Sequence, residues 1–140
     1  MNSLLTLLIL VAAPLPADEA AQSAAVQPAS ASFKEGEAAL KIAAAEMALS
    51  IGKPPPTVMK RYVLKKNWEF VRDPDGVLKG RAVEAVVFFK GGESGQCTRR
   101  QCTLTEQDQG GKWGKPGLDC IESLTMRVQC KSVEALKGGK

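Results

Sequence analysis

Residues 57–90, TVMKRYVLKKNWEFVRDPDGVLKGRAVEAVVFFK, decide the fold of this chain. In the first half apolar and polar residues alternate, as in a strand with one buried face, and the apolar set is Tyr62, Leu64, Trp68 and Phe70. Residues 73–76 (DPDG) are a strong turn signal, because Pro suits the second turn position and Gly tolerates a positive φ. Residues 77–90 are therefore expected to return as an antiparallel strand.

The turn also predicts a register for these two strands. If Arg72 faces Val77, the apolar residues of the first strand share one face and Trp68 lies opposite Arg81. An arginine across from a tryptophan suits a cation–π contact. Tyr62 and Trp68 are expected either to build the core of a small domain or to line a pocket under a helix.

A helix is expected before the hairpin, from about residue 33 to residue 51. Apolar side chains recur there at spacings of three, four or seven, namely Phe33, Leu40, Ala44, Met47 and Ile51, with Ile42 and Leu49 widening the stripe. Ser32 and Glu35 fit a capping box at its start, and Gly52 is placed to end it. One broad face of this helix is therefore expected to pack on the strands.

Two more strands are expected after the hairpin, over 96–107 and 118–130. Residues 32–130 are thus predicted to form a single α+β domain, with one N-terminal amphipathic helix packed on a four-stranded antiparallel meander sheet. The arrangement resembles that of cystatin-like and NTF2-like domains by architecture alone, because the sequence has no motif of either family. Residues 131–140 are expected to form a flexible tail.

The first 17 residues have the features of a signal peptide. Their apolar run, residues 4–13 (LLTLLILVAA), is far shorter than the ~20 apolar residues of a membrane-spanning helix. Cleavage is expected after Ala17, although the lack of Lys or Arg before the run leaves an uncleaved anchor as the alternative. Residues 18–31, which are small and polar, are expected to be a flexible linker. The protein is therefore predicted to be periplasmic or secreted, without a stable membrane span.

Charge is distributed unevenly along the chain, whose formal charge is +4. Residues 18–52 hold two basic and five acidic groups, whereas residues 53–140 hold seventeen basic and ten acidic groups. A basic domain favours a protein partner with an acidic surface or an anionic component of the cell envelope, and export makes nucleic acid the least expected partner. The oligomeric state is left open.

The sequence offers no catalytic constellation. It contains no histidine, and no nucleotide-binding, zinc-protease or serine-hydrolase motif. We therefore expect a protein that is not an enzyme and that uses no cofactor.

Four cysteines in an exported chain predict two disulfides. On one continuous strand Cys120 and Cys130 would lie ~33 Å apart, too far to pair with each other. The nesting of the last two strands favours Cys97 with Cys130 and Cys102 with Cys120 over the crossed alternative. A zinc site is disfavoured, because there is no close C-x-x-C pair and no histidine.

Two candidate binding segments stand out. Residues 110–117 (GGKWGKPG) place Trp113 between Lys112 and Lys115, and a disulfide from Cys102 to Cys120 would clamp this loop. Trp113 is expected either to be presented to a partner or to fold back over the open end of the core.

Basic residues outside that loop form the second candidate. Arg99 and Arg100 are candidates for half of an anion site. A further basic cluster consists of Lys60, Arg61, Lys65 and Lys66. A solvated face that keeps the strands soluble is the alternative interpretation of both groups.

Together these features predict a secreted or periplasmic, non-catalytic binding module for an acidic or amphipathic partner. One alternative is an exported enzyme inhibitor that acts through the disulfide-clamped loop. Another is a small-ligand carrier or enzyme with a pocket between helix and sheet.

Overall fold

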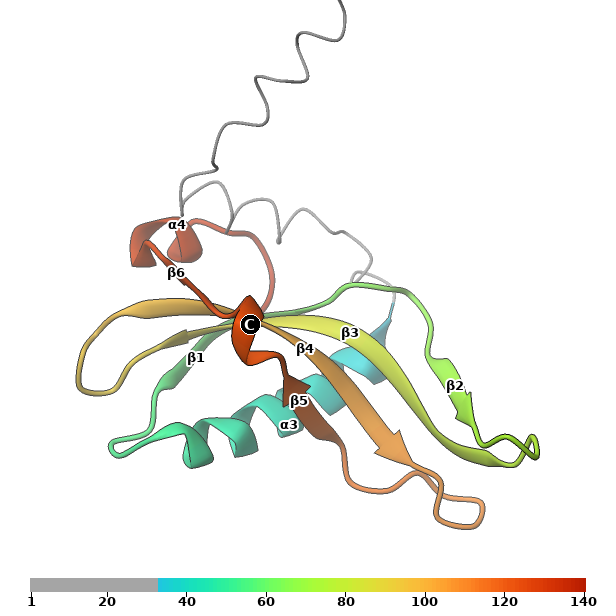
Figure 1. Cartoon of the computed structure of the whole chain (residues 1–140). Coiled ribbons are helices and arrows are strands. Elements are labelled where there is room, and N and C mark those ends of the chain that lie inside the picture. Colours follow the sequence, from blue (N-terminus) through green and yellow to red (C-terminus); the bar gives the residue numbers. More distant parts are fainter. Residues whose placement is uncertain (1–32) are drawn as a thin grey trace, which may run out of the picture.

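A computed structural model describes residues 33–140, so the predicted signal peptide, the linker and the capping residue Ser32 lie outside the described part of the chain. The elements in chain order are α3 (Lys34–Ile51), β1 (Thr57–Val63), β2 (Glu69–Arg72), β3 (Leu78–Lys90), β4 (Cys97–Gln107), β5 (Gly117–Cys120), the 3-10 turn η2 (Glu122–Leu124), β6 (Met126–Val128) and α4 (Cys130–Glu134). Figure 1 shows α3 on one side of the sheet and α4 on the other.

The sheet is an antiparallel meander built on the long pair β3 and β4. Strands β1 and β2 both pair with β3, and β5 and β6 both pair with β4. The α+β class and the antiparallel sheet are confirmed, whereas the expected count of four strands is wrong. The sheet has six strands because the first and the last of the expected strands are each broken in two.

The first strand breaks because residues loop out between β1 and β2. The N–H of Leu64 donates to the carbonyl oxygen of Glu84, and Glu69 pairs with Ala82. Five steps along the chain from Leu64 to Glu69 thus correspond to two steps along β3, which leaves three extra residues. Because side chains alternate between faces, an odd number of extra residues reverses the face that the following residues occupy.

This reversal corrects the predicted register. Tyr62 pairs with Val86 instead of Val87 and lies on the α4 side, in one cluster with Val86. Phe70 pairs with Arg81, which shares its face of β3 with the residues packed under α3. The aromatic residues expected on one face are therefore divided between the two sides of the sheet.

The larger core lies between α3 and the sheet. Small residues on α3, among them Ala43 and Ala44, let the helix approach the strands closely, and the cluster also contains Leu40, Val63, Val83, Ala85, Val87, Phe89 and Leu104. Ile42 and Leu49 do not widen the buried stripe as expected, because their side chains are exposed. The space under α3 is filled by packed side chains.

The start of α3 also differs from the prediction. Phe33 occupies the capping position, and no side chain bonds to the backbone there. The Glu35 carboxylate, expected to complete a capping box, instead accepts hydrogen bonds from Arg81 and from the indole N–H of Trp68.

A second, smaller core lies on the opposite side of the sheet, under α4. It consists of Tyr62, Val86, Phe88, Cys97, Val128 and Val133. Residues 131–140, expected to be a flexible tail, instead contribute to α4 and to the closing segment, residues 135–140. Val133 of α4 is fully buried, and the Tyr62 hydroxyl holds the closing segment by donating to the carbonyl oxygen of Lys137 over 2.9 Å.

Two disulfides are present, in the pairs favoured by strand nesting. Cys97–Cys130 ties the start of β4 to α4, and Cys102–Cys120 links residues that face each other on β4 and β5. The unequal spacing of the cysteines is absorbed by η2, which separates β5 from β6. Such bonds are typical of proteins in non-reducing, extracytoplasmic surroundings. Within residues 33–140, no helix is both long and apolar enough to cross a bilayer.

Candidate functional site

The loop that carries Trp113 turns inward. Trp113 is half-buried and forms a bridge with Asp108, and the Arg81 guanidinium lies 4.2 Å from the centre of its ring. Lys112 is exposed, while Lys115 forms a surface ion pair with Glu46 on α3. Of the two expected arrangements, the structure has the one in which Trp113 folds back over the end of the core.

Arg81 lies at the centre of the contacts that Trp113 makes at this end of the sheet. Its side chain is 7% exposed and lies between two indole rings, 4.2 Å from the centre of Trp68 and equally far from that of Trp113. The cation–π pair expected between Trp68 and Arg81 is therefore present. The guanidinium also pairs with the Glu106 carboxylate at 2.6 Å and with the Glu35 carboxylate at 2.7 Å.

These contacts already occupy the indole faces and the positive charge that a ligand would need. Two carboxylates already balance the one cation, and both indole rings already stack on it. The hydrogen bond from Arg81 is the main reason that the pKa of Glu35 lies below its ordinary value of 4.5, because it stabilises the ionised form. The contacts of this cluster are therefore satisfied within the chain, where they stabilise the fold.

Arg99 and Arg100 do not form a joint site. They are consecutive residues of the regular strand β4, so their side chains lie on opposite faces of the sheet. Arg99 donates to the side-chain oxygen of Gln101 over 3.4 Å, and its burial lowers the pKa of the guanidinium. Arg100 lies over the ring of Phe89 on the α3 side, with 5.8 Å to the ring centre.

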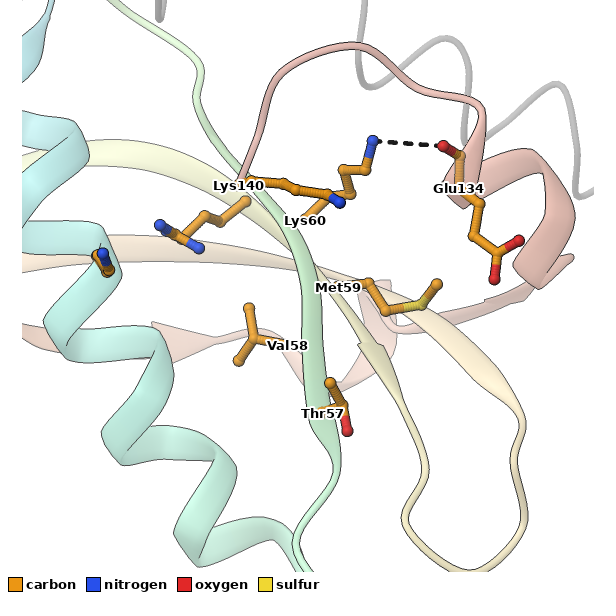
Figure 2. A pocket seen from close by; sticks show the side chains of 8 residues that line it. Thr57, Val58, Met59, Lys60, Glu134 and Lys140 are labelled. Carbon is orange, nitrogen blue, oxygen red and sulfur yellow. Dashed lines mark hydrogen bonds between the residues drawn. The ribbon is translucent and has the colours of Figure 1, made fainter.

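A pocket of about 500 Å³ lies beside β1, and we call it the β1 groove. It is lined by Lys41, Thr57, Val58, Met59, Lys60, Arg61, Glu134 and Lys140. Figure 2 shows Val58 and Met59 pointing to opposite sides of the strand. Because five consecutive strand residues line one pocket, the groove must run along the edge of β1 and not over one face of the sheet.

The β1 groove is strongly basic. Four of its lining residues are lysine or arginine, against the single carboxylate of Glu134. They come from three parts of the chain, since Lys41 belongs to α3, Lys60 and Arg61 to β1, and Lys140 to the closing segment. A concave surface bordered by one sign of charge attracts groups of the opposite sign.

Lys60 is the buried cation of the groove, at 5% exposure. Its ammonium group donates to the carbonyl oxygens of Glu134, the last residue of α4, at 3.5 Å, and of Leu136, just after it. Figure 2 draws the first of these bonds. Burial is the main cause that lowers the pKa of Lys60, and the charge of Lys140 adds to it. Because carbonyl oxygens carry only partial charge, the positive charge of Lys60 is not neutralised.

Arg61 connects the groove to the closing segment. Its backbone N–H donates to the carbonyl oxygen of Gly139 over 2.7 Å. Its side chain and that of Lys140 also line a neighbouring pocket of about 370 Å³ between α3 and the closing segment. Burial lowers the pKa of the Arg61 guanidinium, although the Glu37 carboxylate opposes this effect.

The lining residues of the groove can bind anions. Lysine and arginine side chains supply hydrogen-bond donors and positive charge, which carboxylates and other anions accept. The four cysteines are all in disulfides, so none supplies a nucleophile. Within residues 33–140, no group of three or more acidic or cysteine side chains is arranged to hold a metal ion.

Sequence reasoning included part of this groove in a basic cluster. Lys60 and Arg61 line it, whereas Lys65 and Lys66 lie in the loop between β1 and β2 and line a different pocket with Trp68. Lys41 and Lys140 were not singled out, because only the packing of α3 and of the closing segment brings them to the strand. Compared with known proteins, the chain matches no protein-family model, no curated protein and no solved structure.

Proposed function

We propose that this protein is a non-catalytic binding module that acts in the periplasm or outside the cell and recognises an acidic or amphipathic partner through the β1 groove. The observation that carries the proposal is the groove itself, a concave strand edge with four cations and one carboxylate. Val58 and Met59 add apolar surface within the same groove, which suits an amphipathic partner. The two disulfides fit a location outside the cytoplasm.

The test compares pairs of charge reversals with equal effects on net charge. Lys41→Glu with Lys140→Glu alters two exposed cations of the groove, and Lys65→Glu with Lys66→Glu alters two exposed cations elsewhere. Three fluorescent probes represent the anionic classes: an acidic peptide, a sulfated polysaccharide and vesicles with anionic headgroups. Binding is measured at physiological ionic strength, where distant charges are screened beyond ~8 Å.

We expect wild-type protein to bind at least one probe and the groove variant to bind it about tenfold more weakly, a difference of ~1.4 kcal/mol. The control variant is expected to stay close to wild type. Equal losses in both variants would indicate non-specific attraction, and no binding to any probe would contradict the proposal. A loss confined to Lys112→Glu with Lys115→Glu would place the binding surface at the Trp113 loop instead.

A further inference from the structure

The outer edge of β1 already pairs with one piece of main chain. Arg61 N–H donates to the carbonyl oxygen of Gly139 over 2.7 Å, so the closing segment runs beside the strand at that point. In the described part of the chain this is the one backbone hydrogen bond from β1 to a segment other than β3. Residues 57–60 lie beyond it, and they line the open part of the groove.

The groove has the position and length of an added strand. Residues 57–60 span at most roughly 13 Å at ~3.3 Å per residue, and β1 shifts its register on β3 between Val58 and Lys60, so an extended segment of about three to four residues fits along them. A strand edge offers N–H and C=O groups that a second extended chain can pair with, which is the basis of recognition by strand addition. The groove is bordered by α3 on one side and by Glu134 and Lys140 on the other.

The charges select the kind of chain that can occupy this edge. Successive side chains of an extended peptide point to opposite sides, and cations from α3, from β1 and from the closing segment border the groove. A second copy of this protein would bring its own cations, from Lys41 and Arg61, against the same groups. Repulsion between like charges therefore disfavours pairing of two β1 edges.

We propose that the β1 groove binds an extended acidic segment of a partner protein, which adds to the outer edge of β1 over residues 57–60, next to the place that Gly139 occupies. This inference rests on the proposed function and specifies its partner class and its mode of recognition. Main-chain hydrogen bonds supply affinity, and acidic side chains facing Lys41 and Lys140 supply specificity.

The experiment separates main-chain pairing from attraction between charges. The probes are fluorescent peptides of about ten residues in which Glu alternates with Val, Leu or Thr, together with copies N-methylated at alternate residues along either edge. N-methylation removes the N–H donors of one edge and leaves the charge unchanged. Binding is measured by fluorescence anisotropy with the full chain, and amide hydrogen exchange is measured with and without each peptide.

We expect an unmodified acidic peptide to bind and N-methylation of one edge to weaken binding at least about tenfold. Lys41→Glu with Lys140→Glu is expected to weaken it similarly, and Lys65→Glu with Lys66→Glu to change it less than about twofold. Those amides of residues 57–60 that point away from β3 are expected to gain protection from exchange when the peptide binds, because the others already bond to β3.

The failures of the two proposals are distinguishable. Equal binding of methylated and unmodified peptides, or protection elsewhere in the chain, overturns strand addition but leaves anion binding in the groove intact. Binding to anionic vesicles or to the sulfated polysaccharide without binding to any acidic peptide also overturns it. If none of these probes binds, strand addition and the proposed function fail together.

Discussion

Arg81 shows how one residue can close an end of a small domain. The sheet extends beyond the start of α3 (Figure 1), and Arg81 packs there between Trp68 and Trp113. Its charge is matched by Glu106, which is itself buried at 8% exposure. Because a buried ion pair is stable only while both partners remain, either partner alone would be costly.

Replacing Arg81 with Met should therefore destabilise the protein strongly. The variant keeps an apolar side chain between the two indole rings but leaves the Glu106 carboxylate buried without its cation, which typically costs about 3–5 kcal/mol. Urea unfolding monitored by tryptophan fluorescence measures the change. The control is Lys79→Met on the same strand, where an exposed pair with Asp73 is worth ~0–1 kcal/mol. Similar small losses in both variants would show that the ion pair is unimportant.

Glu35 predicts how stability depends on acidity. Its pKa is lowered in the folded protein, mainly by the hydrogen bond from Arg81. Between the folded and the unfolded pKa, the unfolded chain therefore binds more protons than the folded chain. The stability that the ionised Glu35 carboxylate adds to the fold is fully present above the ordinary pKa of 4.5. It is lost as the pH falls through the lower pKa of the folded protein. The unfolding free energy of Glu35→Gln should therefore fall less between neutral and acidic pH than that of wild type.

The control for that comparison is Glu37→Gln. Both glutamates lie in the first turn of α3, so they share any effect of the helix dipole, but only Glu35 pairs with Arg81. Urea unfolding across a pH series gives the slope of the unfolding free energy against pH for each variant. A Glu35→Gln slope as steep as that of wild type would contradict the role assigned to the carboxylate.

At the scale of elements, the closing segment depends on a close approach to Tyr62. A Cβ at Gly139 would lie 2.6 Å from the Tyr62 ring, and Gly139 has a positive φ of 78°. Gly138 shares the positive φ, at 69°, but a Cβ there would meet no atom within 4 Å. The two glycines thus separate the effect of the backbone from that of the contact.

Gly139→Ala should displace the closing segment, whereas Gly138→Ala should mainly add backbone strain, of order 1–3 kcal/mol. Tyr62 is the one tyrosine in the chain, and its burial raises the pKa of the phenol above 10.0. Ultraviolet titration should show that pKa returning toward its ordinary value in Gly139→Ala and staying raised in Gly138→Ala. An unchanged titration in both variants would mean that the segment does not shield Tyr62.

The elements that the sequence predicts well are those with a local cause. The 73–76 turn forms because the Asp73 carboxylate accepts hydrogen bonds from the backbone N–H groups of Asp75 and Val77. The break between β1 and β2 had a weaker signal, the three consecutive polar residues 65–67 (KKN), which was overlooked because the apolar residues Leu64 and Trp68 on either side keep the same parity. The predicted face of Tyr62 was therefore wrong, although the pairing of the two strands with β3 was correct.

The second core had a signal that pattern reasoning missed. Residues 85–89 (AVVFF) are apolar at every position, which is typical of a strand buried on both faces. Cys130, Val133 and Leu136 follow at helical spacing, and these residues contribute to the layer that covers the second face. The groove could be predicted only in part, because Lys41 and Lys140 reach it through tertiary packing.

At the scale of the whole molecule, one sheet separates two cores, and a disulfide lies on each side. Cys97–Cys130 belongs with the core under α4, while Cys102–Cys120 lies on the α3 side, where the Cys120 sulfur is 3.4 Å from that of Met47. Oxidation thus adds one covalent link on each side of the sheet. These links are typical of proteins in a non-reducing compartment.

Intact-mass measurement of the exported protein tests that link. We expect a chain that begins at Asp18 and is about 4 Da lighter than its fully reduced form, because each disulfide removes two hydrogens. Peptide mapping without reduction should recover the Cys97–Cys130 and Cys102–Cys120 pairs. Free thiols or an intact Met1 in the exported protein would contradict the predicted processing.

The looped-out residues between β1 and β2 bear on engineering. Both strands find their register independently on β3, so the length of chain between them is not dictated by either pairing. Lys66 and Asn67 are exposed there, ahead of the packed ring of Trp68. An epitope or fluorophore-labelling tag inserted between these two residues should leave the strands aligned and the groove accessible, which makes this the natural attachment point for finding the partner.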